Sequence, residues 1–496
     1  MPVLQDDPGP RRTRTGIPDA DLPRKRPDLT PQPATPNKRY DAIVVGTGHN
    51  GLIAAGYLAR AGKKVLVLER RGVIGGATVT EEPWPGYRLS TCSYVCSLLL
   101  PEVIRDLELV RHGYRVRPID PQYFVPFPDG RHIMSYLDGE RTKAQIRKFS
   151  EKDAAAYDYY WEMWDRVVAR MRPLLMGPPP TPEQLEASFD GPEGEEDWQT
   201  LTRKSIAELL EGFFESEEIK APLCVGGVIG TNAGPRTPGT AYVKFHHILG
   251  NVGGHRGAWG YVEGGMGSVA GALAASAKAH GAEILTSAEV AKVEIRDGAA
   301  RGVVFHDGRS LKADVVLSNA DPHRTYLGMV GEEHLPAELV EGLGRMRVEG
   351  SVVKVLLALG ELPDFAAAPG KEIGPQHTGG IVINPSVEYL QRAWEDCEAG
   401  RPSARPYMEG FIQSATESGL APPGKHTLSL FCQYAPYELS EGGWEERRDE
   451  IGANMIRTFA EYAPNLPDAI EHMQVLGPPD IESVIGITGG NIFHGE

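Results

Sequence analysis

The stretch YDAIVVGTGHNGLIAAGYLARAGKKVLVLERRGVIGG, residues 40–76, decides the fold. Three of its glycines, Gly46, Gly48 and Gly51, have the spacing G-x-G-x-x-G. This pattern alone proves little, because the chain contains 58 glycines among 496 residues. The residues on either side of the glycines therefore have to decide whether they form a nucleotide site.

Those flanking residues predict a β-turn-α-β unit. The apolar, β-branched run 42–45 is typical of a buried parallel strand, and the glycines follow it at once. Residues 52–61 predict a helix that Gly62 ends, and residues 64–68 predict a second buried strand. Glu69 follows that strand, 21 positions after Gly48, where a dinucleotide-binding unit places an acidic residue.

Each of these residues has a physical task in such a unit. Gly46 permits the tight turn, Gly48 lets the backbone approach a pyrophosphate, and Gly51 lets helix and strand pack closely. The helix N-terminus offers free N–H groups and a partial positive charge to the phosphates. Glu69 accepts hydrogen bonds from a ribose diol. The stretch thus predicts a dinucleotide site, for which FAD and NAD both qualify.

A second, relaxed match occurs at Gly265, Gly267 and Ala270. It follows the residues YVEG, where we expect no buried strand, so we predict no nucleotide site there. Residues 268–281 predict an Ala-rich helix that Ser268 caps and Gly281 ends.

Alternation of apolar and polar residues after this helix predicts a three-stranded meander. Its two tight turns are Asp297-Gly298 and Asp307-Gly308, and the residues DVVLSNA then return as a buried strand. We expect this block to fold back onto the first β-turn-α-β unit.

Bulk properties describe a globular chain with an acidic surface. The sequence is 41% hydrophobic and 24% charged, and its net charge of −16 argues against nucleic-acid binding. Runs of apolar residues are too short for a transmembrane segment. Residues 1–38 predict a disordered, proline-rich tail. The cysteines, five in all, are too few for a disulfide scaffold and indicate a reducing compartment: the cytoplasm, or the mitochondrial matrix in a eukaryote.

The remaining sequence predicts a separate α+β domain. The segment 154–176 places Tyr157, Trp161, Trp164, Val168 and Met171 on one helical face, either as core or as a wall of an apolar substrate tunnel. The segment 177–197 predicts a mobile acidic loop, and SIAE at residues 205–208 predicts a capping box. SVVKVLLAL, TGGIVINP, YMEGFIQSA and HTLSLFCQY predict four strands of one antiparallel sheet.

In combination these motifs resemble the phytoene-desaturase and amine-oxidase type of flavoprotein. The likeness extends from residue 39 to the end of the chain. Its closest matches are the glycine loop with His49-Asn50, ERR at Glu69–Arg71, TEE at Thr80–Glu82, and the segments 85–109, 148–161, 261–274 and 313–327.

The resemblance implies an α/β fold with a discontinuous Rossmann-like FAD-binding domain and an α+β substrate domain with an antiparallel sheet. The FAD-binding domain would comprise residues 39–105 and 260–325, with residues 477–496 returning to it. The substrate domain would comprise residues 106–259 and 326–476. Members of this group continue beyond the position of Glu496 with a glycine-rich segment and a final helix, so we expect the chain to be truncated there.

The resemblance also implies which residues bind FAD. The pyrophosphate would lie on the glycine loop, the adenosine ribose on Glu69, the adenine on the backbone of Val290, and the flavin end near Gly264. The full predicted set is Gly46, Gly48, His49, Asn50, Gly51, Glu69, Arg70, Gly75, Gly76, Ala77, Val290, Gly264 and Gly265.

Candidate polar groups near the flavin are His246, His247, Arg256 and Glu263, none of which we assign as catalytic. No metal site is predicted. A disulfide reductase would carry a redox cysteine pair soon after the glycine doublet, whereas this chain has ATVTEEPWPGY there. Cys92 and Cys96 do not have the C-x-x-C spacing, so we expect no dithiol chemistry.

We therefore expect an FAD-dependent oxidoreductase that transfers a hydride from a largely apolar organic substrate to flavin, in a desaturation or in amine or C–H oxidation. The electron acceptor would be oxygen, a quinone or a protein, and a homo-oligomer is possible. Three alternatives stay open: a carotenoid-type desaturase or isomerase, an enzyme that uses NAD alone, and a flavin-binding regulatory or interaction protein without turnover.

Overall fold

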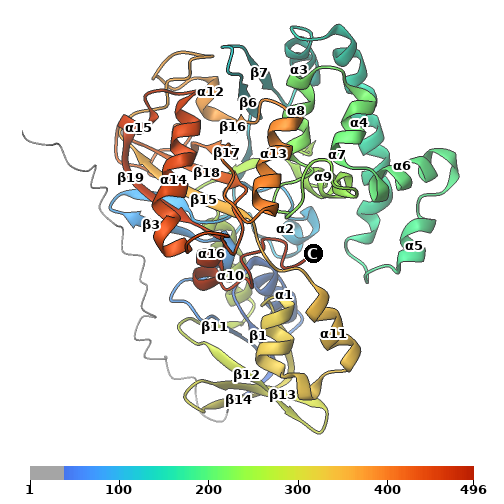
Figure 1. Cartoon of the computed structure of the whole chain (residues 1–496). Helices are drawn as coiled ribbons and strands as arrows, with labels where there is room; N and C mark the ends of the chain where they lie inside the picture. The colour runs from blue at the N-terminus through green and yellow to red at the C-terminus, as the bar shows by residue number, and fades with distance from the viewer. Residues whose placement is uncertain (1–37) are drawn as a thin grey trace, which may run out of the picture.

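The computed structural model describes residues 38–496, so the predicted tail lies outside the described residues except for Lys38. Two large sheets organise the chain. In Figure 1 the six-stranded sheet occupies the lower part of the molecule and the seven-stranded sheet the upper part. Both sheets combine strands that are distant in sequence, because long segments are inserted between their strands.

The six-stranded sheet contains the first β-turn-α-β unit. Strand β1 pairs in parallel with β2 on one side and with β14 on the other, and helix α1 (His49–Arg60) packs beside helix α10 (Gly267–Ala279). Small side chains on both helices, including Ala55, Ala59 and Ala277, let them lie close to Val44 and Val67 of the sheet. The strands, in spatial order, are β11 (Glu283–Leu285), β2 (Val65–Leu68), β1 (Arg39–Val45), β14 (Ser310–Ser318), β13 (Ala299–Phe305) and β12 (Val290–Arg296).

The predicted meander is observed, with two differences. Its third strand and the returning strand are a single element, β14. The returning residues are also not buried as predicted, since Val315 is 52% exposed and residues 316–318 are only partly buried. Residues 310–312 of β14 pair antiparallel with β13, and residues 312–318 pair in parallel with β1. One strand offers hydrogen-bonding groups at both edges, so β14 joins the meander directly to the first β-turn-α-β unit.

The seven-stranded sheet unites the four predicted strands. β15, β18, β17 and β16 are neighbours in that order and pair antiparallel, as the alternation of side chains predicted, while β6 joins β16 in parallel. The strands, in spatial order, are β19 (Ile470–Leu476), β15 (Val352–Leu359), β18 (His426–Gln433), β17 (Tyr407–Phe411), β16 (Gly380–Ile383), β6 (Tyr123–Pro126) and β7 (His132–Ser135).

The two faces of this sheet differ in chemistry. One face is apolar and packs against helix α14 (Trp444–Ala460), through residues such as Val355, Leu430 and Met455. Because successive side chains of a strand point to opposite faces, the residues between the apolar ones point away from α14. On that second face lie Lys354 of β15 and Glu409 of β17.

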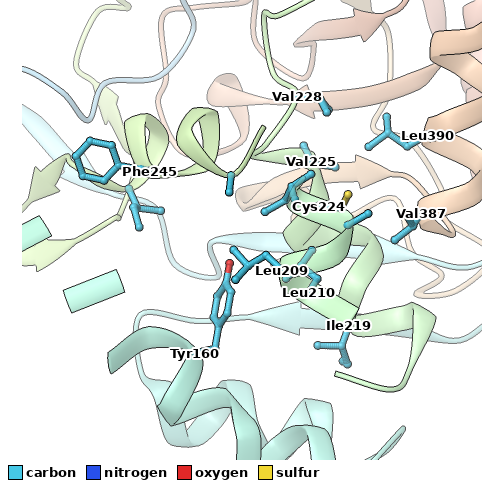
Figure 2. Packing of buried hydrophobic residues seen from close by; sticks show 14 of the residues in the cluster. Tyr160, Leu209, Leu210, Ile219, Cys224, Val225, Val228, Phe245, Val387 and Leu390 are labelled. Carbon is cyan, nitrogen blue, oxygen red and sulfur yellow. The ribbon is translucent and has the colours of Figure 1, made fainter. Parts of the chain in front are cut away.

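Helices cover the second face toward the side of β6 and β16. They share one apolar cluster, to which Tyr160, Leu210, Phe245 and Leu390 belong from four helices (Figure 2). In Figure 1 these helices fill the upper right of the molecule. They are α3 (Gly139–Ile146), α4 (Glu151–Met171), α5 (Pro182–Ala187), α6 (Gly191–Arg203), α7 (Ile206–Phe213), α8 (Glu217–Val225), α9 (Thr240–Ile248) and α13 (Val387–Glu398).

Helix α4 shows the predicted apolar face, rotated slightly. Trp164, Val168 and Met171 are buried in the same apolar cluster, whereas Tyr157 and Trp161 are only half-buried at its edge. The capping box of α7 is confirmed: the Ser205 hydroxyl accepts a hydrogen bond from the Glu208 N–H at 3.1 Å, and the Glu208 carboxylate accepts one from the Ser205 N–H at 2.9 Å.

Three local predictions were wrong. The segment 177–197 is not a loop, because it contains α5 and the start of α6. Thr181 and Gln184 form a capping box at the start of α5, and this pattern can be recognised in the sequence. The relaxed glycine match does follow a buried strand, β10 (Gly260–Val262), although β10 pairs only with β5 (Val116–Pro118). Helix α10 begins at Gly267, so Ser268 does not cap it.

Shorter elements connect these units. Those near the first sheet are η1 (Gly76–Thr78), β3 (Thr80–Trp84), β4 (Tyr87–Ser90), α2 (Pro101–Asp106), β8 (Asn251–Val252), β9 (His255–Arg256), η3 (His323–Val330), η4 (Glu332–His334) and α11 (Ala337–Arg345). Those of the second half are η2 (Arg172–Leu174), α12 (Pro375–Thr378), η5 (Gln413–Ala415), α15 (Leu466–Ala469) and α16 (Pro478–Ile485).

Candidate active site

The glycine loop lies between the end of β1 and the start of α1. Gly46 has a φ of +98°, a conformation that favours glycine, and a Cβ on Gly51 would lie 2.4 Å from the carbonyl oxygen of Gly46. A Cβ on Gly48 would lie 2.3 Å from Nδ2 of Asn319, the residue after β14. Within the loop, Gly51 therefore packs against Gly46, and Asn319 packs against Gly48 from the end of the neighbouring strand.

The glycine doublet, Gly75 and Gly76, lies against the glycine loop. Gly75 and Gly76 have φ values of +122° and +55°, and a Cβ on Gly76 would lie 3.3 Å from the Cα of Gly48. The Gly75 N–H donates a hydrogen bond to the Thr47 hydroxyl at 3.3 Å. Ala77 follows in η1, where its carbonyl accepts a bond from the Ser93 N–H at 3.0 Å.

Glu69 is buried directly after β2, with 6% of its surface exposed. One carboxylate oxygen accepts bonds from the Thr47 N–H at 3.0 Å and from the Thr47 hydroxyl, and the other accepts one from the Arg71 N–H at 2.8 Å. A carboxylate has about four acceptor positions, so these three bonds leave capacity for a further donor. The Glu69 carbonyl also accepts a bond from the Ala288 N–H at 2.7 Å, which places Val290 two residues away.

The two arginines after Glu69 have different surroundings. Arg70 donates hydrogen bonds to the carbonyl oxygens of Ser483 and Val484, at 3.2 and 2.6 Å, in the last turn of α16. Arg71 pairs with Glu81 at 2.6 Å, and its second terminal nitrogen, Nη1, is buried without a hydrogen-bond partner. Arg71, which was not among the predicted site residues, thus has a free donor.

The end of the described chain is held against the first sheet. The buried carboxylate of Asp321, which follows β14, accepts hydrogen bonds from the N–H and the hydroxyl of Thr488, at 3.0 and 2.8 Å. It also accepts one from the Arg324 N–H at 3.0 Å. In the view of Figure 1 the C-terminal end of the chain lies between the two sheets.

A cavity lies between the glycines after β10 and the second face of the seven-stranded sheet. Gly264 and Gly265 have φ values of +78° and +87°, and a Cβ on Gly265 would lie 2.5 Å from the Thr80 hydroxyl oxygen. The cavity is small, with a volume of about 20 Å³. Its lining residues are Arg88, Leu89, Ser90, Tyr94, Gly265, Phe411, Gln413, Leu420, Thr427 and Ser429.

Buried charges stand beside this cavity. Lys354 and Glu409 are 2% and 4% exposed. The Tyr94 hydroxyl donates a hydrogen bond to the Glu409 carboxylate at 2.8 Å, and the Lys354 ammonium lies 4.0 Å from the centre of the Tyr94 ring. Lys354 also donates to the Ser429 hydroxyl at 2.8 Å. Since Tyr94 and Ser429 line the cavity, both charges lie one side chain away from it.

Burial shifts the ionisation of this pair in opposite directions. It raises the pKa of Glu409 to about 7, although the hydrogen bond from Tyr94 and the charge of Lys354 oppose the shift. Burial likewise lowers the pKa of Lys354 to about 8, against the attraction of Glu409. Both groups therefore titrate close to neutral pH, which suits proton transfer.

The contacts of the four predicted polar candidates, His246, His247, Arg256 and Glu263, do not involve Lys354 or Glu409. Burial lowers the pKa of His247 to about 3, and its Nδ1 lies 2.8 Å from the Val243 carbonyl oxygen within α9. The neighbouring ring of His246 lies against Phe493. Arg256 pairs with Asp165, and Glu263 lies 3.8 Å from Arg117 at a surface where both side chains are about half exposed.

All five cysteines are unpaired thiols. Burial raises the pKa of Cys92 to about 11 and also raises that of Cys96, whose sulfur contacts the Tyr114 hydroxyl at 3.6 Å. A thiol whose pKa is raised is poorly nucleophilic at neutral pH.

The residues at the centre of the site were not among those predicted. Lys354 and Glu409 each interrupt an apolar strand, in VVKVL and YMEGF, and this is the signal that could have marked them. Which strands are neighbours, and hence that the two side chains meet beside Tyr94, is a property of the sheet order and not of the local sequence.

Comparison with known proteins identifies the family of this chain. Residues 51–363 match the family of flavin-containing amine oxidoreductases. The chain is 39% identical over 490 residues to the pyridine nucleotide-disulfide oxidoreductase domain-containing protein 2 of Rattus norvegicus, with 92% of this chain and 84% of the rat protein covered. It is 29% identical to one of the subunits of limonene dehydrogenase from Castellaniella defragrans, with 86% of this chain and 79% of that protein covered.

Among solved structures, an oxidoreductase from Methanosarcina mazei has the same fold. Its TM-score is 0.58 at 19% identity, and the alignment covers 89% of this chain and 88% of that protein. No helix within residues 38–496 is both long enough and apolar enough to cross a membrane. The match over residues 51–363, together with the identity to the rat protein, places this chain in the flavin-containing amine oxidoreductase family, as an oxidoreductase whose cofactor is FAD.

Proposed function

We propose that this protein oxidises a C–H bond of a largely apolar organic molecule by hydride transfer to FAD. The observation that carries the proposal is the cavity between Gly265 and the second face of the seven-stranded sheet, with Lys354 and Glu409 buried beside it. A buried acid and a buried base are costly to maintain, and such groups are concentrated at reactive sites.

The residues present suit FAD. The N-terminus of α1 carries no acidic residue in its first turn, and the glycine loop and doublet meet there without side chains between them. We propose that these glycines with His49 and Asn50 hold the pyrophosphate, Glu69 the ribose and the backbone of Val290 the adenine. Arg71 Nη1, buried without a partner, is a further donor for this group. When bound, the flavin accepts a hydride from a carbon atom of the substrate.

The chain itself supplies position and proton transfer. Tyr94 and Phe411 line the cavity with aromatic surface, which excludes water and orients an apolar substrate. Glu409, with a pKa of about 7, accepts a substrate proton at its carboxylate when the reaction releases one, and Tyr94 keeps that carboxylate oriented. The charge of Lys354 stabilises negative charge that develops near Ser429.

The Castellaniella relative is named for limonene, an apolar hydrocarbon, and the matched family is named for amines. We propose that the body of the substrate is apolar. The product then identifies the bond that is oxidised: a carbon–carbon bond would give an alkene, and a carbon–nitrogen bond would give an imine. Oxygen, a quinone or a protein is the proposed acceptor for the electrons.

Anaerobic bleaching of the flavin tests the proposal. The purified protein, loaded with FAD, is mixed without oxygen with panels of apolar amines and alkenes, and visible absorbance is recorded. Bleaching by one compound class supports hydride transfer, and its product identifies the reaction as amine oxidation or desaturation. Glu263→Gln at the surface should bleach as fast as the unchanged protein, whereas Glu409→Gln should bleach at least tenfold more slowly. FAD that binds but is bleached by no compound class would favour the regulatory alternative.

A further inference from the structure

A groove of about 640 Å³ lies between helices α2 and α4, and it shares no lining residue with the cavity beside Glu409. Its floor is formed by Val168 and Ala169 of α4 and by Pro173 and Met176, which follow that helix. Because η2 continues α4 without a break and Pro173 is one turn beyond Ala169, these side chains form a continuous apolar stripe.

The groove lies between two parts of the molecule. Helix α2 is attached to the first β-turn-α-β unit, since the Tyr57 hydroxyl of α1 donates a hydrogen bond to the Asp106 carboxylate at 3.0 Å. Helix α4 belongs to the helices that cover the second sheet. Small-molecule sites are concave surfaces of about 300–1,000 Å³ that often lie between such units, and the volume of the groove is within that range.

The charged side chains of the groove neutralise one another. Arg172 lies 3.2 Å from Glu102 and so ties η2 to α2 across the groove. All the charged lining residues form ion pairs of this kind: Arg172–Glu102, Arg256–Asp165 and Arg105–Asp106. A charged ligand would lose hydration here and meet cations and anions that already have partners, so the groove favours an uncharged ligand.

The surface that remains for a ligand is apolar. Met176 is 54% exposed, and the adjacent Leu175 is 41% exposed. Large apolar side chains that stay in contact with water around a concavity are typical of binding sites. The flexible thioether of Met176 can adapt its shape to different apolar molecules.

Residues 256–261 connect the groove to the cavity. Arg256 lines the groove, and a Cβ on the next residue, Gly257, would lie 3.8 Å from the Trp161 ring of α4. Trp259 then packs in an apolar cluster with Phe411, which lines the cavity. The cavity, at about 20 Å³, is close to the size of one water molecule, so an organic substrate needs a larger binding space.

We propose that the groove between α2 and α4 is a binding site for the substrate at the protein surface, and that it takes an uncharged apolar molecule. The inference rests on the proposed function and specifies where its substrate first binds and of which charge class that substrate is. Val168, Ala169 and Met176 would contact the apolar body, while the Arg172–Glu102 pair holds the two helices in place.

Nile red, an uncharged apolar dye whose fluorescence rises in apolar surroundings, serves as the probe. Titrated into the FAD-loaded full chain, it should bind at a saturable site. Met176→Asp places a charge in the groove and should weaken that binding about tenfold or more, whereas Met176→Leu should keep it within about threefold. Equal affinity for Met176→Asp and the unchanged protein would overturn the proposal.

Ile373→Asp is the matched control. Ile373 is 56% exposed, as Met176 nearly is, but it lies in a loop that does not line the groove. This variant should bind Nile red like the unchanged protein, and an equal loss there would contradict a specific site. Ala169→Trp, which fills the groove with a ring, should weaken binding as Met176→Asp does. If it fails to fold, the exposed position 176 still decides the result.

Competition between octan-1-ol and octanoate tests the charge class. The two molecules share the alkyl chain, and octan-1-ol should displace Nile red at a concentration about tenfold lower or less. Glu102→Gln leaves Arg172 without its partner and should reduce this preference several-fold, because the free guanidinium then attracts the carboxylate. Equal displacement by both molecules, or a preference that Glu102→Gln leaves unchanged, would overturn the assignment to an uncharged ligand.

Flavin bleaching separates this inference from the proposed function. With a substrate that bleaches the flavin, Met176→Asp should raise the half-saturating substrate concentration about fivefold or more and leave the limiting rate within about twofold. An unchanged half-saturating concentration would overturn the groove as a substrate site while the proposed function stands. Nile red binding that Met176→Asp weakens, without bleaching by any compound class, would sink the proposed function and support the groove as a site for apolar molecules.

Discussion

Lys354 and Glu409 lie opposite the same residue, Phe431, from the two sides of strand β18. Directly opposed residues of antiparallel strands point to one face of a sheet, so the two charged side chains share the face that borders the cavity. The Tyr94 hydroxyl bonds Glu409 while the Tyr94 ring lies under Lys354, which makes this tyrosine the link between them.

Gly48→Val should abolish FAD retention. A Cβ at this position would lie 2.3 Å from Asn319 Nδ2, so the loop or Asn319 must move, and the glycine doublet that touches Gly48 moves with it. We expect a purified protein without flavin absorbance and a loss of about 1–3 kcal/mol in the free energy of unfolding.

Gly271→Ala is its control, because a Cβ at Gly271 in α10 meets nothing within 4 Å. This variant should keep its flavin and gain up to about 1 kcal/mol of stability, since alanine favours a helix. Full flavin occupancy in Gly48→Val would contradict our assignment of the pyrophosphate site.

Asp321→Ala should loosen the end of the chain. It removes the buried acceptor of three hydrogen bonds, two of which come from Thr488. We expect a loss of roughly 2–4 kcal/mol in unfolding free energy and faster hydrogen exchange in residues 486–494. Asp314→Ala in β14, which removes an exposed partner of Arg39 in β1, should change stability by no more than about 0.5 kcal/mol. Unchanged exchange in Asp321→Ala would show that other contacts hold this segment.

Glu409 should make the stability of the protein depend on pH. Its pKa rises from 4.5 to about 7 on folding. The stabilisation that this rise contributes to the free energy of unfolding is fully present below pH 4.5 and is lost as the pH rises through 7. Relative to Glu409→Gln, the unchanged protein should therefore lose up to about 3 kcal/mol between pH 4.5 and pH 7. Denaturant titrations of both proteins across this interval measure the difference, and a constant difference would show that Glu409 does not change its ionisation on folding.

Tyr94→Phe should move the pH dependence of flavin reduction to higher pH. The hydroxyl stabilises the ionised form of Glu409 and lowers the pKa of that carboxyl, so its loss raises the pKa, while the phenylalanine ring preserves the contact with Lys354. Anaerobic reduction rates from pH 5 to pH 9 measure the shift. Tyr159→Phe, at an exposed position of α4, should have an unchanged profile. A shift to lower pH would rule out Glu409 as the group that titrates.

Local sequence predicted the elements whose signals are local. The run 42–45, the glycine loop and Glu69 identified the first β-turn-α-β unit, and SIAE identified a capping box, because turns, caps and parallel strands depend on residues a few positions apart. A capping box at Thr181 and Gln184 likewise begins a helix, in a proline-rich and acidic segment for which we expected a loop.

The sequence by itself thus determined the strands of the first unit and of the meander, four strands of the second sheet, the glycine loop and the resemblance to a flavoprotein family. Only the tertiary structure decided that β14 serves both the meander and the first unit, and that Lys354 and Glu409 both contact Tyr94, which lines the cavity. These three residues come from two strands and a loop, and Tyr94 and Glu409 are 315 positions apart. Their meeting depends on the order of strands in the sheet and on the helices packed over it, and no periodicity within a segment encodes that order.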